Sequence, residues 1–194
     1  MSLHASPVTA AVTGDAPTLE QRIATIEALE AIRSLKAHYA ALADQKYTPQ
    51  YSKVPPAEMQ RVARQQAECF TVDAVWDGGK DFGATLIGRD ALTQWFNRSP
   101  WCFAVHFYGS PQIEVHGEKA SGQWRLWQMA LRDDTHEAVL LAGVTTEEYA
   151  LQSDGRWLQS RMRFDQIHML PVSDIPYPLS FSFATKPQLE VPRV

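Results

Sequence analysis

The chain has 194 residues, of which 45% are hydrophobic and 21% charged, and its formal net charge is −4. This length and composition are typical of one globular domain with a sizeable core. The slightly acidic balance, without a cluster of Lys and Arg, argues against binding to nucleic acid or to an anionic membrane surface. No stretch approaches the roughly 18 apolar residues of a membrane span.

The first 17 residues are rich in Ala, Ser, Thr and Pro and lack the basic and apolar segments of a signal peptide. We therefore expect a flexible arm over 1–17 and one domain over 18–170. An extended, Pro-rich tail over 171–194 is expected to dock on the domain or on a neighbouring subunit. Cys69 and Cys102 have no metal-ligand spacing, so we expect reduced thiols in a cytoplasmic protein.

The stretch over 19–46 predicts a long first helix. Thr18 and Gln21 form a capping box at its start. An apolar stripe at three- and four-residue steps predicts that one helix face lies on a core. The stripe consists of Leu19, Ile23, Ile26, Leu29, Ile32, Leu35, Tyr39 and Leu42.

Asp44 lies outside this stripe, near the end of the predicted helix. The turns before it carry only small side chains, at Ala37, Ala40 and Ala41. Such an alanine strip can seat a close-packed neighbour, or it can form the floor of a pocket beside the carboxylate.

The pattern of the chain changes from helical to period two along its length. A second helix from Pro56 to about Phe70, a short strand over 74–77 and a third helix after Gly88 come first. Alternation then predicts strands over 103–110, 112–116, 120–131, 138–152 and 157–169, with hairpin turns at 117–119 and 153–155. Helices followed by strands predict an α+β fold, in which N-terminal helices pack on a curved antiparallel sheet.

Six short motifs, in this order, resemble the SnoaL-like branch of the NTF2-like (cystatin-like) superfamily. They are Ile32-x-x-Leu-Lys-x-x-Tyr39-x-x-x-x-Asp44, Asp73-Ala-Val-Trp-Asp-Gly78, Gly88-Arg-Asp-Ala-Leu92, His106-x-x-Gly-x-x-x-Ile113-x-Val115, Ala120-x-Gly122-x-Trp124, and Glu148-Tyr149 followed by Asp154-Gly155-x-Trp157. The resemblance implies a cone-shaped fold with an apolar pocket between the helices and the sheet. It also implies a homo-oligomer, with a trimer favoured over a dimer.

The resemblance implies specific roles for three residues. The scytalone- and bile-acid-dehydratase-like and dehydrochlorinase-like members pair an aspartate at the end of the first helix with a histidine on a mid-sheet strand, which correspond to Asp44 and His106. Bile-acid members add a tyrosine that Tyr39 matches. In the ketosteroid-isomerase branch the base lies at the position of Asp77 instead. The chain departs from its relatives in lacking the arginine after Tyr149 and a second carboxylate near Gln128.

These residue types suit proton abstraction from carbon. Histidine has an ordinary pKa of about 6.5, and a carboxylate at one ring nitrogen fixes the tautomer and stabilises the imidazolium. A tyrosine hydroxyl can donate to a leaving group or an oxyanion. We expect substrate contacts from Trp76, Asp77, Phe103, Tyr108, Trp127 and Met129. Trp76 and Phe103 can also be ordinary core or oligomer contacts, and Asp77 before two glycines can be a turn former.

The sequence therefore predicts a cofactor-independent lyase of the dehydratase type, without a metal, for a small aromatic or polycyclic hydroxylated substrate in aromatic compound catabolism. The alternatives are an aldehyde-releasing C–C lyase on an aryl hydroxymethyl compound and a double-bond isomerase. Two further alternatives are not enzymes: an apolar-ligand binding protein and the small subunit of an aromatic-ring dioxygenase. The predicted partners are a small apolar substrate and further copies of the chain, with neither nucleic acid nor membrane.

Overall fold

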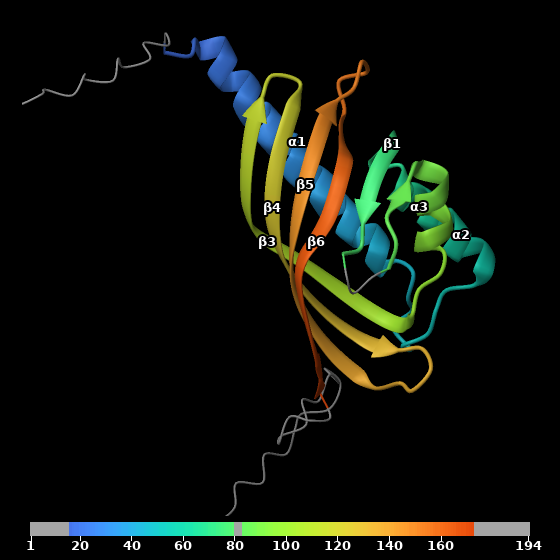
Figure 1. Ribbon diagram of the computed structural model, residues 1–194. Coiled ribbons are helices and arrows are strands. Elements are labelled where there is room, and N and C mark those ends of the chain that lie inside the picture. Colours follow the sequence, from blue (N-terminus) through green and yellow to red (C-terminus); the bar gives the residue numbers. More distant parts are fainter. Residues whose placement is uncertain (1–15, 80–82, 173–194) are drawn as a thin grey trace, which may run out of the picture.

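The computed structural model describes residues 16–79 and 83–172. Three helices, α1 (Leu19–Asp44), α2 (Pro56–Ala67) and α3 (Arg89–Phe96), lie beside one sheet (Figure 1). The strands are β1 (Phe70–Asp77), β2 (Leu86–Ile87), β3 (Trp101–His116), β4 (Lys119–Arg132), β5 (Ala138–Leu151) and β6 (Trp157–Pro171). The predicted arm and tail fall almost entirely outside the described residues. In the described part of the chain, no helix has the length and apolar character needed to cross a membrane.

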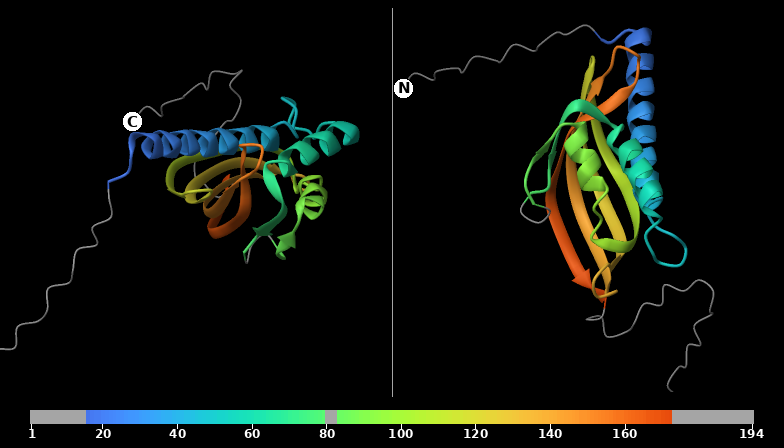
Figure 2. Two further views of the ribbon diagram at one scale, coloured as in Figure 1. Left: turned by 90° about the horizontal axis from the view of Figure 1, so that it is seen from above. Right: turned by 90° about the vertical axis from the view of Figure 1, so that its right-hand side faces the viewer.

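The six strands form one curved sheet in the order β2-β1-β6-β5-β4-β3. All neighbouring strands are antiparallel except β1 and β6, which pair in parallel. The predicted α+β fold is confirmed, and the parallel pair makes the sheet mixed. Figure 2 shows α1 lying along one side of the curved sheet, with α2 and α3 gathered near the C-terminal end of α1. The space between the sheet and these helices holds the core.

The predicted start of α1 is confirmed, because Thr18 and Gln21 form both hydrogen bonds of the capping box. The stripe that follows is only half buried. Ile32, Tyr39 and Leu42 are buried, whereas Leu19, Ile23 and Ile26 are exposed. The prediction that the whole stripe lies on a core is therefore wrong for the described chain, since the first turns of α1 project beyond the end of the sheet (Figure 2).

Two predicted boundaries also change. The second helix ends at Ala67, and Phe70 begins β1 rather than closing the helix. The two strands predicted on either side of Pro111 form the single strand β3, which continues through an irregularity between Gly109 and Gln112. Ser110 takes a φ of 48° there, so a bulge absorbs the proline without ending the strand.

Candidate active site

Asp44 is the last residue of α1, where a negative charge is electrostatically unfavourable. The alanine strip before it forms the floor of an open groove between α1 and β3. This groove is lined by Ala37, Ala40, Ala41 and Asp44 from the helix, and by His106 and Tyr108 among the residues of the strand. Of the two interpretations of the strip, the structure supports a groove floor.

His106 faces α1 from β3, on the same side of the strand as Ala104 and Tyr108. Its ring Nδ1 lies 2.7 Å from Asp44 Oδ1, and its backbone N–H donates to the same oxygen at 3.0 Å. The exposed fraction is 14% for the His106 side chain and 32% for that of Asp44. The structure thus brings together the two residues that the sequence predicted as a dyad, although 62 positions separate them.

The hydrogen bond assigns the tautomer of His106. A carboxylate can only accept, so Nδ1 carries the proton and Nε2 carries the lone pair. Burial lowers the pKa of His106, and the hydrogen bond and charge of Asp44 raise it in part. The charges of Lys46 and Lys36 lower this pKa further. Since burial has the larger effect, the imidazole is neutral near pH 7, which is the form that a general base requires.

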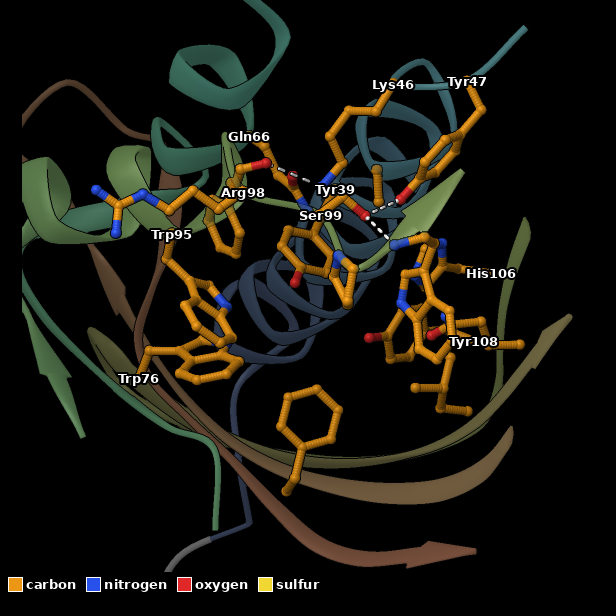
Figure 3. A pocket seen from close by; sticks show the side chains of 17 residues that line it. Tyr39, Lys46, Tyr47, Gln66, Trp76, Trp95, Arg98, Ser99, His106 and Tyr108 are labelled. Carbon is orange, nitrogen blue, oxygen red and sulfur yellow. Dashed lines mark hydrogen bonds between the residues drawn. The ribbon is translucent and has the colours of Figure 1, made fainter. Parts of the chain in front are cut away.

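A cavity of about 130 Å³ lies beside the dyad, between the helices and the inner face of the sheet. Figure 3 shows its opposite walls: His106 and Tyr108 on one side, and Trp76 and Trp95 on the other. The remaining lining side chains are Tyr39, Ala43, Lys46, Tyr47, Gln66, Phe96, Arg98, Ser99, Pro100, Trp101, Leu126, Gln128 and Phe164. His106 lines both this cavity and the outer groove, so it connects Asp44 to the cavity.

Tyr39 and Tyr108 belong to one aromatic cluster inside this cavity. Tyr39 makes edge contacts with Phe70, Phe96 and Tyr108, at ring-centroid distances of 5.7 to 6.1 Å. Burial raises the pKa of both phenols above the ordinary value. Both hydroxyls are therefore protonated at physiological pH and can act as hydrogen-bond donors.

The predicted substrate contacts divide into two groups. Trp76 and Tyr108 line the cavity, as does the predicted donor Tyr39. Asp77 does not line it, because its Oδ1 accepts the backbone N–H of Gly79 at 2.9 Å within a turn. Phe103 also lies elsewhere, against the rings of Tyr47 and Tyr51.

Trp127 and Met129 were predicted on the wrong face of β4. The even-numbered residues of this strand are the buried ones, so Leu126 and Gln128 reach the cavity. Trp127 is 53% exposed on the opposite face of the sheet. Both faces of β4 carry large side chains, and period two alone does not distinguish them.

A buried polar network behind Tyr39 was not predicted. Lys36 on α1 forms an ion pair with Glu147 on β5, and both side chains are almost completely buried. Glu147 also accepts hydrogen bonds from Thr145 Oγ1 at 2.7 Å and Tyr149 Oη at 2.5 Å. The Lys36 Nζ lies 3.8 Å from the centroid of the Tyr108 ring. One sequence signal was present, since Lys36 stands four residues after Ile32 and three before Tyr39, on the buried stripe.

Lys46, in the turn after α1, is a second cation that was missed. Its side chain lines the cavity and is 7% exposed. Burial lowers its pKa to about 8, and the charge of Asp44 acts in the opposite direction. Among the described residues, no three His, Cys, Asp or Glu side chains are grouped so that they could hold a metal ion.

Comparison with solved structures finds the same fold. The chain is 19% identical to hexachlorocyclohexane dehydrochlorinase LinA-type3 from Novosphingobium barchaimii LL02, with a TM-score of 0.64 over 80% of this chain and 97% of that one. It is 20% identical to an NTF2-like protein with a cystatin-like fold from Novosphingobium aromaticivorans, with a TM-score of 0.57 over 75% of this chain and 86% of that one. At these identities the likeness shows the fold alone. Comparison with curated protein sequences finds no significant match.

The family is shown by sequence. The model of the SnoaL-like domain matches residues 60–163, which is more than half of the chain. The match contains His106 and begins after α1, so the placement of Asp44 rests on the geometry above. The protein belongs to the SnoaL-like family.

Proposed function

We propose that the protein is a lyase that eliminates water from a small, hydroxylated aromatic compound. The observation that carries this proposal is the hydrogen bond between Asp44 Oδ1 and His106 Nδ1 at the wall of an aromatic cavity. It leaves the Nε2 lone pair of His106 for a substrate proton. An acid–base pair of this kind needs neither a metal nor a redox cofactor to form a carbon–carbon double bond.

In the proposed reaction, His106 Nε2 takes a proton from the carbon next to the one that bears the hydroxyl. The electrons of that C–H bond form the double bond, and the C–O bond breaks. The imidazolium of His106 passes that proton to the departing hydroxyl, which leaves as water, while the Tyr39 hydroxyl donates a hydrogen bond to it. Asp44 holds the ring and stabilises the imidazolium until the proton is passed on.

The size of the cavity favours a single aromatic ring over a polycyclic substrate. An engineered protein cavity of about 150 Å³ is known to bind benzene, and the cavity here, of about 130 Å³, is comparable. The indoles of Trp76 and Trp95, in tilted contact with each other on one wall, offer an aromatic surface to such a ring. The similar LinA-type3 protein is named a dehydrochlorinase, and dehydrochlorination is also an elimination.

A base at Asp77, as in a ketosteroid-isomerase-like reaction, has no comparable support. Its carboxylate accepts the Gly79 N–H, and the residue is not part of the cavity lining in the described chain. Release of an aldehyde by C–C cleavage would use the same dyad. The product assay below separates it from loss of water.

The test is a panel of one-ring aryl compounds with a hydroxyl β to an acidic C–H. Each is incubated with wild type, and product formation is followed by the ultraviolet absorbance of the new conjugated double bond. Mass spectrometry then distinguishes loss of water from loss of an aldehyde.

We expect the variants His106→Gln and Asp44→Asn to lose about 10²- to 10⁴-fold in rate, the usual contribution of general acid–base catalysis. A His106→Gln variant as active as wild type would refute the mechanism. If compounds of the panel bind, but neither wild type nor the two variants convert them, the cavity is a storage site.

A further inference from the structure

The Lys46 ammonium group is buried in the cavity wall with few partners. Within the described chain, it donates a hydrogen bond to the Phe96 carbonyl at 3.4 Å, which is longer than the usual 2.9 to 3.0 Å. The face of the Phe96 ring lies 5.7 Å away. An ammonium has three donors, and burying a charge is costly unless oxygen acceptors surround it. The site therefore has donor capacity that the described protein groups do not use.

The charges around the cavity have one sign. Lys46 and Arg98 line it together with His106, and the described lining residues include no Asp or Glu. The Asp44 carboxylate, whose charge acts on Lys46, lines the outer groove and is bound to His106. An electron-rich or anionic group in the cavity would thus meet attraction from the side chains that surround it.

Three further side chains of the lining have polar atoms without a hydrogen-bond partner. Trp76 Nε1 and Gln128 Nε2 are donors, and Gln66 Oε1 is an acceptor. All three side chains are more than nine-tenths buried. Buried polar atoms are normally paired, so atoms of this kind around one cavity indicate a ligand that supplies the missing partners. With Lys46, donors outnumber acceptors, and the ligand is expected to be rich in acceptor oxygens.

We propose that the cavity binds its substrate through an oxygen attached to the aromatic ring, and that Lys46 holds this oxygen in its anionic form. The shared chemistry is a conjugated ring oxygen, either a phenolate or the enolate of a ring ketone. This inference rests on the proposed function for the reaction, but the binding itself requires no turnover. Lys46 keeps its proton throughout. When the oxygen belongs to a ring ketone, Lys46 stabilises, by charge and hydrogen bonding, the negative charge that this oxygen gains as His106 removes the carbon-bound proton, and the enolate electrons then form the double bond as the C–O bond breaks. When the oxygen belongs to a phenol, it is bound as the anion from the start.

The test uses 4-nitrophenol, because its phenolate is coloured and its neutral form is not. At a fixed pH at which the free probe is partly ionised, binding to wild type should increase the phenolate absorbance. The Lys46→Met variant should lose this increase and bind the phenolate at least about tenfold more weakly, as expected for a hydrogen bond to a charged group. Nitrobenzene, which lacks the ring oxygen, should bind both proteins equally. Exchange of the α-hydrogens of 2-cyclohexenone with solvent deuterium, followed by mass spectrometry, then tells an enolate site from one that takes only phenolates.

Three variants separate the possible failures. Lys53→Met removes a cation that does not line the cavity and should retain the phenolate shift. His106→Gln should also retain it, even though this variant is expected to be inactive, so binding is tested apart from catalysis. Lys46→Arg, which keeps the charge, should preserve the shift and serves if Lys46→Met fails to fold. The proposal is overturned if wild type binds 4-nitrophenol in its neutral form, or if Lys46→Met binds the phenolate as tightly as wild type.

Discussion

One oxygen of Asp44 accepts two hydrogen bonds from His106, from the ring Nδ1 at 2.7 Å and from the backbone N–H at 3.0 Å. The two bonds fix the carboxylate relative to the strand as well as to the ring. The orientation of the imidazole is therefore set by the packing of α1 on β3, and any change in that packing would be transmitted to the base.

The first prediction concerns the titration of His106. Because Asp44 raises the pKa of this ring against the effect of burial, Asp44→Asn should lower it further below the ordinary value of 6.5. An NMR titration of the ring in both proteins measures the change without a substrate. Asp77→Asn, which removes a carboxylate outside the cavity, should leave the titration unchanged. Identical curves for wild type and Asp44→Asn would mean that the two groups do not interact in solution.

The second prediction is the pH dependence of turnover. Since burial lowers the pKa of His106, the neutral base persists below pH 6.5, and kcat/KM should begin to fall only at more acidic pH. Asp44→Asn should displace this acid limb to still lower pH, while reducing the plateau. The measurement is kcat/KM as a function of pH, with a compound from the panel that the wild-type protein converts. An acid limb above pH 6.5 would show that another group controls the reaction.

Much of this arrangement could be predicted from the sequence, because it depends on local patterns. The capping box of Thr18 and Gln21 marks the start of α1, and alternation marks β3 to β6. Asp44 was conspicuous as a carboxylate at a helix end, and His106 as a histidine in an apolar strand. Their pairing came from the family resemblance, since nothing local connects residues so far apart in the chain.

The errors arise where a pattern shows which residues share a face but not which element packs against that face. The stripe through Leu19, Ile23 and Ile26 is a true helix face, but the sheet ends before it. The two faces of β4 are both rich in large side chains, so Trp127 was placed inward although Gln128 is the inward residue. The pairing with Asp44 by itself would raise the pKa of His106, and only the fold reveals the burial that lowers it instead.

The third prediction concerns the buried pair behind the site. Lys36→Met should lower the free energy of unfolding by about 3–5 kcal/mol, because it leaves the Glu147 carboxylate buried without its cation. Urea unfolding measures the loss. The matched control is Lys53→Met, which breaks a partly exposed ion pair with Asp133 and should cost no more than about 1 kcal/mol.

A double variant tests the reason for that loss. Lys36→Met combined with Glu147→Gln removes both charges and should regain a large part of the stability. If the double variant is as unstable as the sum of the two single changes, the loss reflects packing and hydrogen bonding rather than an uncompensated charge.

The fourth prediction concerns assembly. Trp127 and the neighbouring Phe107 are 53% and 57% exposed on the outer face of the sheet, and Leu170 is exposed on the same face. Exposed apolar groups that gather on one face mark interaction sites, and we expect this face to be buried in the predicted homo-oligomer.

Trp127→Glu would place a carboxylate in that interface, so light scattering after size exclusion should show a smaller assembly than for wild type. Val72→Glu, on β1 and three strands from β4 in the sheet order, should keep the wild-type mass. An unchanged mass for Trp127→Glu would exclude this face as the oligomer contact. In that case the exposed first turns of α1, around Ile23, would be the next surface to test.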